Sequence, residues 1–357
     1  MPIADSMSKP INLETCSADQ VGGFHAYLFN LVVFSPFKHR TPYLQRLVQS
    51  IADNFLSRVL FVEIDDTTPN SEPVIQFQSS ALRKEPNITG YEEITFKVPK
   101  DQSEKVSFLL LPYLLPDLPV VMLWGQDPTT EHEILPQLIK FSNRLIFDSE
   151  TAEDLARFSH RILTHADTTS TDLVDLNWAR IKGWRDAFDE VFDCPARLEQ
   201  LTLAKKISIT YNSRQDEFFH HCTTQALYLQ GWLSHQLGWK LRHLEPSKPT
   251  TRVVYFTGSG EAIVELRGIV SDERTPGAIL GVEIEGAYEN DFSLVEKSGT
   301  PQAMVHISSK ETCELPFSVM ISGPRLRYQF LKDLFYSRSS RHYLNTLRVL
   351  SHQDWKQ

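Results

Sequence analysis

The chain has 357 residues, of which 41% are apolar and 23% charged, a composition typical of a globular protein long enough for two domains. Its formal net charge is −9, and the sequence contains no dense run of Lys and Arg. Because neutralising phosphates requires a basic face, this balance argues against a protein that binds nucleic acid.

Targeting signals and membrane spans are not expected. The first seventeen residues have neither an apolar core nor a basic leader, so we expect no secretory signal and a cytoplasmic location. The apolar stretch 108–124 is interrupted by Pro112, Pro116, Asp117 and Pro119, which a membrane-spanning helix rarely accepts, so we expect no membrane association. The four cysteines form no Cys-x-x-Cys pair and are expected to be reduced, structural thiols, with a redox switch as the alternative.

The first half of the chain predicts an α/β domain over residues 21–165, after a mobile tail over residues 1–20. Apolar runs of strand length alternate with amphipathic segments of helix length, which predicts a mostly parallel, layered sheet. The expected strands are 27–34, 59–64, 74–77, 94–98, 120–124 and 144–147, and the expected helices are 41–55, 103–115, 130–141 and 151–163.

Ligands bind sheets of this kind at the carboxyl ends of the strands. The sequence places Ser35, Asp65, Trp124 and Asp148 at those ends. We expect Asp148 to belong to the cap of the helix that follows it, and the alternative is a carboxylate that acts as a base or a ligand.

The second half of the chain predicts an α+β domain over residues 166–350, with helices and an antiparallel sheet. The polar segment His165–Thr171 lacks periodicity and is expected to be the linker. Helices are expected over 173–193 and 216–237, with Gly238 in the left-handed closing position of the second, followed by a helical region over 326–350. The expected strands are 207–211, 253–257, 262–270, 279–288, 302–308 and 317–321, with a hairpin turn at residues 258–260.

The helix expected over residues 173–193 carries a polar side chain inside its apolar face. A guanidinium buried there must be paired, so we expect Arg180 to bind a carboxylate and to stack on Trp184, tying one domain to the other. The alternative is that Arg180 receives an anion or the carboxylate of a partner. Trp184 itself is expected to pack in the core, and Gly183 and Gly231 to permit close approach of helices.

Trp178 and Arg185 share one edge of the same expected helix. Arginine and tryptophan are the residues most enriched at binding hot spots, so this edge is a candidate for contact with a partner. The alternative for Arg185 is an ion pair with Asp189, four residues further along the helix.

No motif for a cofactor, a metal or a nucleophile occurs in the sequence. It contains no Gly-x-Gly-x-x-Gly, Walker A loop, His-Glu-x-x-His or Gly-x-Ser-x-Gly. The adjacent His220 and His221 point to different faces of their expected helix and have no second ligand pair at zinc spacing. We therefore predict no cofactor, no metal site and no catalytic residue.

Six segments carry a resemblance to a known family: NLVV (30–33), SRVLFVE (57–63), LPDLPVVMLWGQDP (115–128), NRLIFDS (143–149), DLNWARIKGWRDAF (175–188) and GWLSHQLGW (231–239). Together they resemble the glucose-6-phosphate dehydrogenase assembly protein family, OpcA. The resemblance implies a non-catalytic partner that promotes assembly or activation of glucose-6-phosphate dehydrogenase, the entry enzyme of the oxidative pentose phosphate pathway. The residues we select as candidates for binding that partner or for tying the domains are Trp124, Asp148, Trp178, Arg180, Trp184 and Arg185.

Two other functions are kept as alternatives. The first is a sugar-phosphate-binding protein or enzyme that uses the carboxyl ends of the N-terminal strands. The second is a purely structural scaffold, which would bind the dehydrogenase without changing its kinetics.

Overall fold

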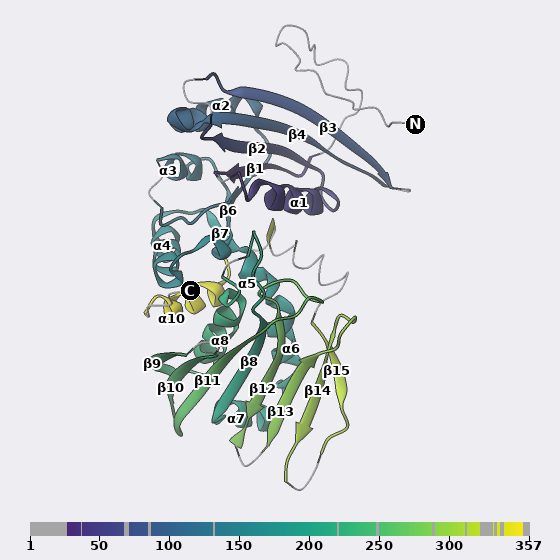
Figure 1. Cartoon of the computed structure of the whole chain (residues 1–357), viewed down its shortest axis with the longest axis vertical. Helices are drawn as coiled ribbons and strands as arrows, with labels where there is room; N and C mark the ends of the chain where they lie inside the picture. Colours follow the sequence, from purple (N-terminus) through teal and green to yellow (C-terminus); the bar gives the residue numbers. More distant parts are fainter. Residues whose placement is uncertain are drawn as a thin grey trace.

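Two β-sheets form the framework of the molecule and lie one above the other in Figure 1. The strand order is β3-β4-β2-β1-β5-β6-β7 in the N-terminal sheet and β15-β14-β13-β12-β8-β11-β10-β9 in the C-terminal sheet. A computed structural model of the chain describes residues 27–352, apart from positions 37, 68–70, 85–86, 131–132, 220, 248–249, 288–289, 311–312, 322–330, 332–333 and 336–338.

The N-terminal sheet is parallel except at the β3 edge. Its central strands are apolar runs buried on both faces, the pattern that parallel sheets covered by helices require. The predicted α/β first domain is therefore confirmed. The strands are β1 (Phe29–Ser35), β2 (Ser57–Asp65), β3 (Val74–Lys84), β4 (Asn87–Pro99), β5 (Val120–Trp124), β6 (Arg144–Phe147) and β7 (Asp172–Asp175).

Helices cover both faces of this sheet (Figure 1). The helix α1 (Thr41–Ala52) packs Leu44 and Val48 on the face that carries Leu31 and Val33. The opposite face is covered by α2 (Val106–Leu110), α3 (Ile134–Ile139) and α4 (Leu155–Thr168).

The apolar stretch 108–124 is divided, as the sequence predicts, into a helix end, a turn and a buried strand. It contains the end of α2, a 3-10 turn over Leu111–Tyr113, and β5. In the part of the chain that the structure describes, no helix combines the length and the apolar character that crossing a bilayer demands.

The C-terminal sheet is antiparallel except for the central pair of β8 and β11. This confirms the predicted α+β second domain and the hairpin turn between β10 and β11. Two of its strands, β9 and β13, were not predicted, because their few apolar residues stand among charged ones. The strands are β8 (Lys206–Asn212), β9 (Lys240–Ser247), β10 (Thr250–Thr257), β11 (Gly260–Ile269), β12 (Ile279–Glu285), β13 (Asp291–Glu296), β14 (Gln302–Ser308) and β15 (Phe317–Met320).

Helices pack on one face of the C-terminal sheet. They are α6 (Lys182–Val191), α7 (Pro195–Thr202) and α8 (Thr224–Gln236). Phe192, at the end of α6, meets Phe292 of β13 at 4.9 Å between ring centroids. Trp239, just after α8, meets Tyr255 of β10 at 5.9 Å.

Two glycines allow close approach, but only Gly231 does so between helices as predicted, because Gly183 meets the backbone after a strand. A Cβ on Gly183 of α6 would lie 1.9 Å from the carbonyl oxygen of Ile321, so this helix can touch the end of β15 only without a side chain there. Gly231 of α8 faces Thr346 and Leu350 of α10 (Arg341–Leu350), where an added Cβ would lie 3.2 Å from the nearest atom.

The segment predicted as one helix over residues 173–193 is three elements. It begins as β7, which pairs in parallel with β6, and continues as α5 (Leu176–Arg180) and α6 with a break at Ile181. The prediction was wrong because pairing with the sheet overrode the helical period of a short apolar run. The sheet thus extends beyond residue 165 and α4 occupies the start of the predicted linker, so we propose a domain boundary between β7 and α5.

The second predicted helix is shorter than expected. It begins at Thr224 rather than Asp216, because the Asp216 carboxylate accepts the N–H groups of Phe218 and Phe219 in a turn of its own. Gly238 takes the predicted left-handed position with φ 66°. Residues 1–20 and most of the first half of the helical region expected over 326–350 lie outside the described residues, and α10 confirms the second half.

The C-terminal helix α10 joins the two domains. It packs against α4 of the first and α8 of the second, and one apolar core continues through all three. Just before it, the backbone N–H of Ser339 donates to Asp172, and the Ser339 hydroxyl accepts from the N–H of Leu173. The end of the chain is thereby fixed to the last strand of the N-terminal sheet.

Candidate functional site

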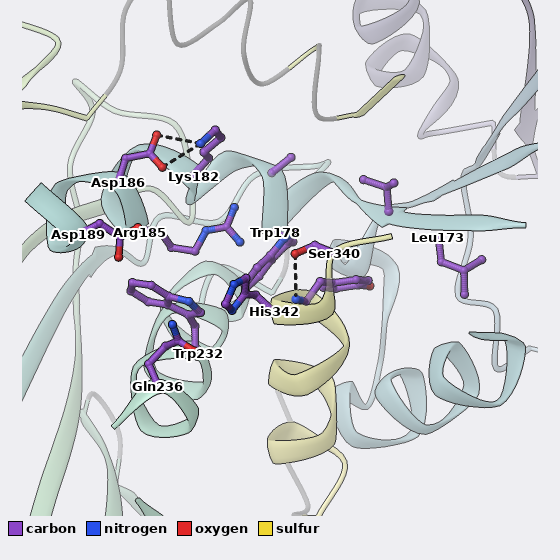
Figure 2. Close-up of a pocket in the computed structure, with 13 residues that line it drawn as sticks. Leu173, Trp178, Lys182, Arg185, Asp186, Asp189, Trp232, Gln236, Ser340 and His342 are labelled. Carbon is purple, nitrogen blue, oxygen red and sulfur yellow. Dashed lines mark hydrogen bonds and ion pairs between the residues drawn. The ribbon is translucent and has the colours of Figure 1, made fainter. Parts of the chain in front are cut away.

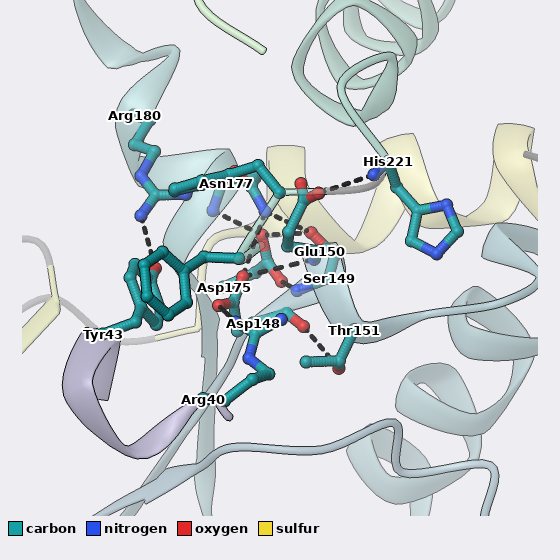
Figure 3. Close-up of polar contacts among 12 residues, drawn as sticks. Arg40, Tyr43, Asp148, Ser149, Glu150, Thr151, Asp175, Asn177, Arg180 and His221 are labelled. Carbon is teal, nitrogen blue, oxygen red and sulfur yellow. Dashed lines mark hydrogen bonds and ion pairs between the residues drawn. The ribbon is translucent and has the colours of Figure 1, made fainter. Parts of the chain in front are cut away.

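Three buried carboxyl groups meet at the carboxyl ends of the N-terminal strands (Figure 3). Asp148 and Glu150 follow β6, and Asp175 ends β7. This is the edge at which ligands bind parallel sheets, as predicted from the position of Asp148. We term the carboxylate cluster the set Arg40, Tyr43, Asp148, Ser149, Glu150, Asp175, Asn177 and Arg180.

Asp148 forms a buried ion pair with Arg40, which lies in the turn between β1 and α1. Arg40 Nη2 is 2.6 Å from Asp148 Oδ2, and both side chains are at most 7% exposed. The other oxygen accepts the N–H of Glu150 and, at 3.3 Å, Nδ2 of Asn177. Asp148 caps the 3-10 turn Ser149–Thr151, whereas the helix that follows, α4, is capped by Asp154 and not by Asp148 as expected. The ion pair with Arg40 is an addition that the sequence analysis did not include.

Asp175 caps α5 from inside the protein. Its Oδ1 accepts the N–H groups of Asn177 and Trp178 at 2.8 and 2.9 Å. Ser149 donates both its N–H and its hydroxyl to the same carboxylate. Burial is the main reason that the pKa of Asp175 is raised to about 7, even though these bonds lower it.

Glu150 faces the second domain. Its Oε1 accepts the backbone N–H of His221 at 2.7 Å. Burial, and after it the negative charge of Asp148, raise the pKa of Glu150 to about 8. Glu150 therefore holds a proton in much of the population at neutral pH.

Arg180 reaches from α5 to α1. Its Nη1 donates to Asn177 Oδ1 at 2.8 Å, and its Nη2 donates to the Tyr43 hydroxyl at 2.7 Å. The guanidinium also lies 5.5 Å from the ring centroid of Phe219 in the second domain. Burial alone would lower the pKa of Arg180, but Tyr43 and Asp148 more than offset it, so the pKa is raised.

The partners of Arg180 differ from those expected, and we propose that its contact with Tyr43 of α1 ties the two domains. Neither a direct carboxylate pair nor stacking on Trp184 is among the contacts that the structure describes for this side chain. The break at Ile181 is the physical reason, because it separates Trp184 from the helix that carries Arg180.

The carboxylate cluster lies where the two domains meet, and its carboxyl groups form hydrogen bonds within the protein. Each of its three carboxyl groups accepts a hydrogen bond from the protein itself. Within the described ranges, no group of three His, Cys, Asp or Glu side chains is arranged to hold a metal ion.

The raised pKa of Glu150 predicts a pH-dependent stability. A carboxyl that binds its proton more tightly in the folded state stabilises the fold most below its unfolded pKa near 4.3, and this stabilisation is lost as pH rises through about 8. With about 1.4 kcal/mol per pKa unit, the effect is on the order of a few kcal/mol. We expect the Tm to fall between pH 5.5 and 8.5, and to fall clearly less in Glu150→Gln.

The matched control is Glu153→Gln, the same change at an exposed position three residues away. This variant should keep the pH dependence of the unchanged protein. Parallel Tm curves for Glu150→Gln and the unchanged protein would show that Glu150 is ionised in the folded state across this range.

A hollow of about 390 Å³ lies beside the cluster, between α5, α6, α8 and α10 (Figure 2). Trp178, Trp232 and Tyr343 form its aromatic wall, and charged residues of α6 form its rim. A concave site with an aromatic wall and a few polar groups is the usual form of a binding site. We term this hollow the tryptophan pocket.

Arg185 lies over Trp178 in this pocket. The guanidinium carbon is 3.5 Å from the ring centroid, a cation–π contact that matches the predicted neighbourhood of the two residues. Next to it, Lys182 Nζ pairs with Asp186 at 2.8 Å. Burial and then Asp186 raise the pKa of Asp189, while Arg185 lowers it. The rim of the tryptophan pocket therefore carries side chains of both charges next to the aromatic wall.

The helix α5 connects the cluster to the pocket. The Trp178 N–H is held by Asp175 of the cluster, while the Trp178 ring lines the pocket. The carboxylate cluster therefore helps to fix the position of Trp178, one of the three residues of the aromatic wall.

The structure places the remaining two candidate residues inside the protein. Trp184 is 5% exposed, in the main apolar core. Trp124 is fully buried and stacks on Phe34 with the ring centroids 4.3 Å apart. Both are core residues, and neither lines the tryptophan pocket.

Several residues of these sites were not selected from the sequence. Arg40 and Tyr43 follow the carboxyl end of β1. This position in the sequence could have placed them near the carboxyl ends of the neighbouring strands. His342 reaches the tryptophan pocket from α10, and no local pattern brings that distant helix to α6.

The fold defines a two-domain protein with a Rossmann-like first domain and an α+β second domain. It is similar to KijD10, a 3-ketoreductase from Actinomadura kijaniata solved with TDP-benzene and NADP. The open conformation of that protein gives a TM-score of 0.54 at 9% identity, covering 90% of this chain and 95% of that one. A second KijD10 structure gives 0.52 at 8% identity over the same shares of the two chains. At this identity, the likeness is one of fold alone.

The chain belongs to the glucose-6-phosphate dehydrogenase assembly protein family, OpcA. Residues 48–164 match the family model described as glucose-6-phosphate dehydrogenase subunit N-terminal domain, and residues 171–315 match the model of the C-terminal domain.

Two curated relatives carry the provisional name OxPP cycle protein OpcA. The one from Synechocystis sp. is 28% identical over 152 residues, which is 42% of this chain and 30% of the relative. The one from Nostoc punctiforme is 26% identical over 170 residues, 46% of this chain and 33% of the relative. The match therefore spans about a third of the length of these relatives.

Proposed function

We propose that this protein is a non-catalytic assembly factor that binds glucose-6-phosphate dehydrogenase and activates it in the oxidative pentose phosphate pathway. The observation that carries the proposal is that both halves of the chain match models described as domains of a glucose-6-phosphate dehydrogenase subunit. The OxPP cycle name of the two curated relatives supports the same role.

The turn after β1 supports a non-catalytic role. In dinucleotide-binding sheets, a glycine-rich turn lets the pyrophosphate approach the N-terminus of the next helix. The KijD10 structures hold NADP, but residues 36–40 of this chain contain no glycine. Arg40 of this turn is instead engaged by Asp148 at 2.6 Å. The turn therefore lacks the sequence of a pyrophosphate cradle.

The tryptophan pocket is the surface that we propose for the dehydrogenase. Binding hot spots are rich in Trp, Tyr and Arg side chains seated in well-packed hollows. Trp178 and Arg185 form such a pair, and Trp232 extends the aromatic wall. Both tryptophans are only 5% exposed, so Arg185 and the charged rim are the accessible part of this surface. The mixed charges of Lys182 and Asp186 at the rim would fix the orientation of a polar partner surface.

Activation follows from linkage between binding and the state of the enzyme. A partner that binds the active oligomer of the dehydrogenase more tightly than the inactive form shifts the population toward the active oligomer. The size of that shift is set by the ratio of the two affinities, and tight binding alone shifts nothing.

The proposal is tested by adding the purified protein to the dehydrogenase and measuring NADP reduction with glucose 6-phosphate. We expect no reduction by the protein alone, and a higher rate or a lower KM when both are present. Co-elution with unchanged kinetics would favour the scaffold. Calorimetric binding of a sugar phosphate by the isolated protein, without any effect on the dehydrogenase, would favour the sugar-phosphate alternative.

Arg185→Ala tests the docking surface. The substitution removes the cation over Trp178 but no core side chain, so the free energy of unfolding should change by only about 1 kcal/mol. If the pocket is the contact, truncating such a residue weakens binding by at least about 1 kcal/mol. The concentration that gives half-maximal activation of the dehydrogenase should therefore rise by roughly fivefold or more.

The matched control is Arg157→Ala, in α4, whose side chain is 82% exposed. It should activate the dehydrogenase as the unchanged protein does. Full activation by a stable Arg185→Ala protein would remove this helix edge from the interface.

A further inference from the structure

The outer edge of β3 is long and unpartnered among the described strands. The strand has eleven residues and stands at the end of the N-terminal sheet, hydrogen-bonded on one side to β4. Its pairing with β4 runs without a bulge from Val74 opposite Lys97 to Lys84 opposite Asn87. On its other side, no described strand pairs with its backbone groups, which form the continuous row that an edge strand presents.

The hairpin of β3 and β4 also projects beyond the sheet (Figure 1). Only residues 92–99 of β4 pair with β2, so the part of the hairpin formed by residues 87–91 and their partners in β3 has no strand of this sheet beside it. Val74 and Phe77, in the first half of β3, are 49% and 60% exposed.

The first nine residues of β3 lack the features that normally prevent edge-to-edge pairing, and the charged residues of the strand, Arg83 and Lys84, stand at its end. Such features are charges, prolines, bulges or a very short strand. Residues 74–82 read VIQFQSSAL, without a charge, a proline or a glycine. This nine-residue run combines β-branched and aromatic residues with no net charge.

The other three sheet edges are protected. The strands β7 and β15 have four residues each, and Ser339 already binds the N–H of Leu173 in β7. The strand β9, KLRHLEPS, contains a lysine, an arginine, a histidine, a glutamate and a proline. Among the described sheet edges, β3 is thus the one built to accept another strand.

We propose that β3 pairs with β3 of a second copy of this chain, antiparallel across a two-fold axis, so that the two N-terminal sheets become one. A strand that pairs with itself must be self-complementary about its centre. Taking Gln78 as the centre places Val74 opposite Leu82 and Phe77 opposite Ser79. No like charges meet within this register.

The residues beside the uncharged run agree with the same register. Continuing the count outward places Glu72 of each copy opposite Lys84 of the other, and Pro73 opposite Arg83. Cross-strand pairs of opposite charge stabilise a ladder, whereas like charges destabilise it. The residues that flank the uncharged run, Glu72 two positions before β3 and Lys84 at its end, therefore carry opposite charges in the order that antiparallel self-pairing requires. This order is the reason to favour a second copy over a foreign strand.

The proposal is tested by light scattering coupled to size exclusion and by sedimentation, over protein concentrations from micromolar to a few hundred micromolar. We expect the mass to approach twice the 41.0 kDa of the chain as concentration rises. Gln78 is exposed, so Gln78→Lys should fold normally while placing like charges on the two-fold axis. This variant should raise the dimer dissociation constant by at least tenfold.

Charge exchange controls for damage to the strand. Gln78→Glu should also be monomeric alone, and an equimolar mixture of Gln78→Lys with Gln78→Glu should dimerise again. A chain that stays monomeric at the highest concentration overturns the proposal, as does a dimer that Gln78→Lys leaves intact. The proposal is also overturned if the unchanged chain is monomeric and the Gln78→Lys variant no longer activates the dehydrogenase. That result would favour a foreign strand at this edge.

Discussion

Replacing Arg40 by methionine is expected to lower the free energy of unfolding by about 3–5 kcal/mol, because it leaves a buried carboxylate without its cation. Asp148, which Arg40 pairs with at 2.6 Å, has no exposed side-chain surface. Its remaining bonds come from the N–H of Glu150 and the amide of Asn177, which carry no net charge. The measurement is urea unfolding of Arg40→Met and the unchanged protein at one fixed pH.

Two further variants separate the ion pair from the loss of packing. Arg157→Ala removes the cation of the pair with Asp154, in which the arginine is 82% exposed, and should change the free energy of unfolding by no more than about 1 kcal/mol. Combining Arg40→Met with Asp148→Asn removes both charges and should recover part of the loss. A double variant less stable than Arg40→Met would indicate that packing at Arg40, and not charge, determines the effect.

The parallel sheet could be predicted because strands buried on both faces are apolar at nearly every position, and this pattern is visible in the sequence. Runs such as FNLVVFS in β1 and VVMLW in β5 are apolar throughout, and few other structures require that pattern. The error at residues 173–193 arises from the opposite situation. Four residues of β7 are too few to show a period, and their state is decided by β6, which lies 25 or more residues earlier in the chain.

The candidate sites were predictable to the extent that they depend on local order. Asp148 follows a buried strand, and Trp178 and Arg185 lie on adjoining helices, so each could be selected from its neighbours in sequence. The partners of Arg180 could not, since Tyr43 and Phe219 reach it from α1 and from the segment before α8. The raised pKa of Glu150 likewise depends on burial by the second domain, which no local pattern specifies.

Trp184→Ala is expected to destabilise the protein by about 3–5 kcal/mol, the usual loss for a large aromatic removed from a core. Trp184 is 5% exposed in α6, the helix that Gly183 brings against the end of β15, so the surrounding backbone has little freedom to close the cavity. Trp184→Phe, which retains an aromatic ring, should lose less. The measurement is urea unfolding, combined with titration of each variant into the dehydrogenase assay.

The two measurements together separate a core residue from an interface residue. At a temperature where Trp184→Ala remains folded, we expect it to activate the dehydrogenase nearly as the unchanged protein does, because the ring does not line the tryptophan pocket. The contrast with Arg185→Ala is therefore the informative result, since it should be stable but a weaker activator. If Trp184→Ala keeps its stability and loses activation, then α6 presents this face to the dehydrogenase, and the packing of α6 against β15 is not what holds the helix in place.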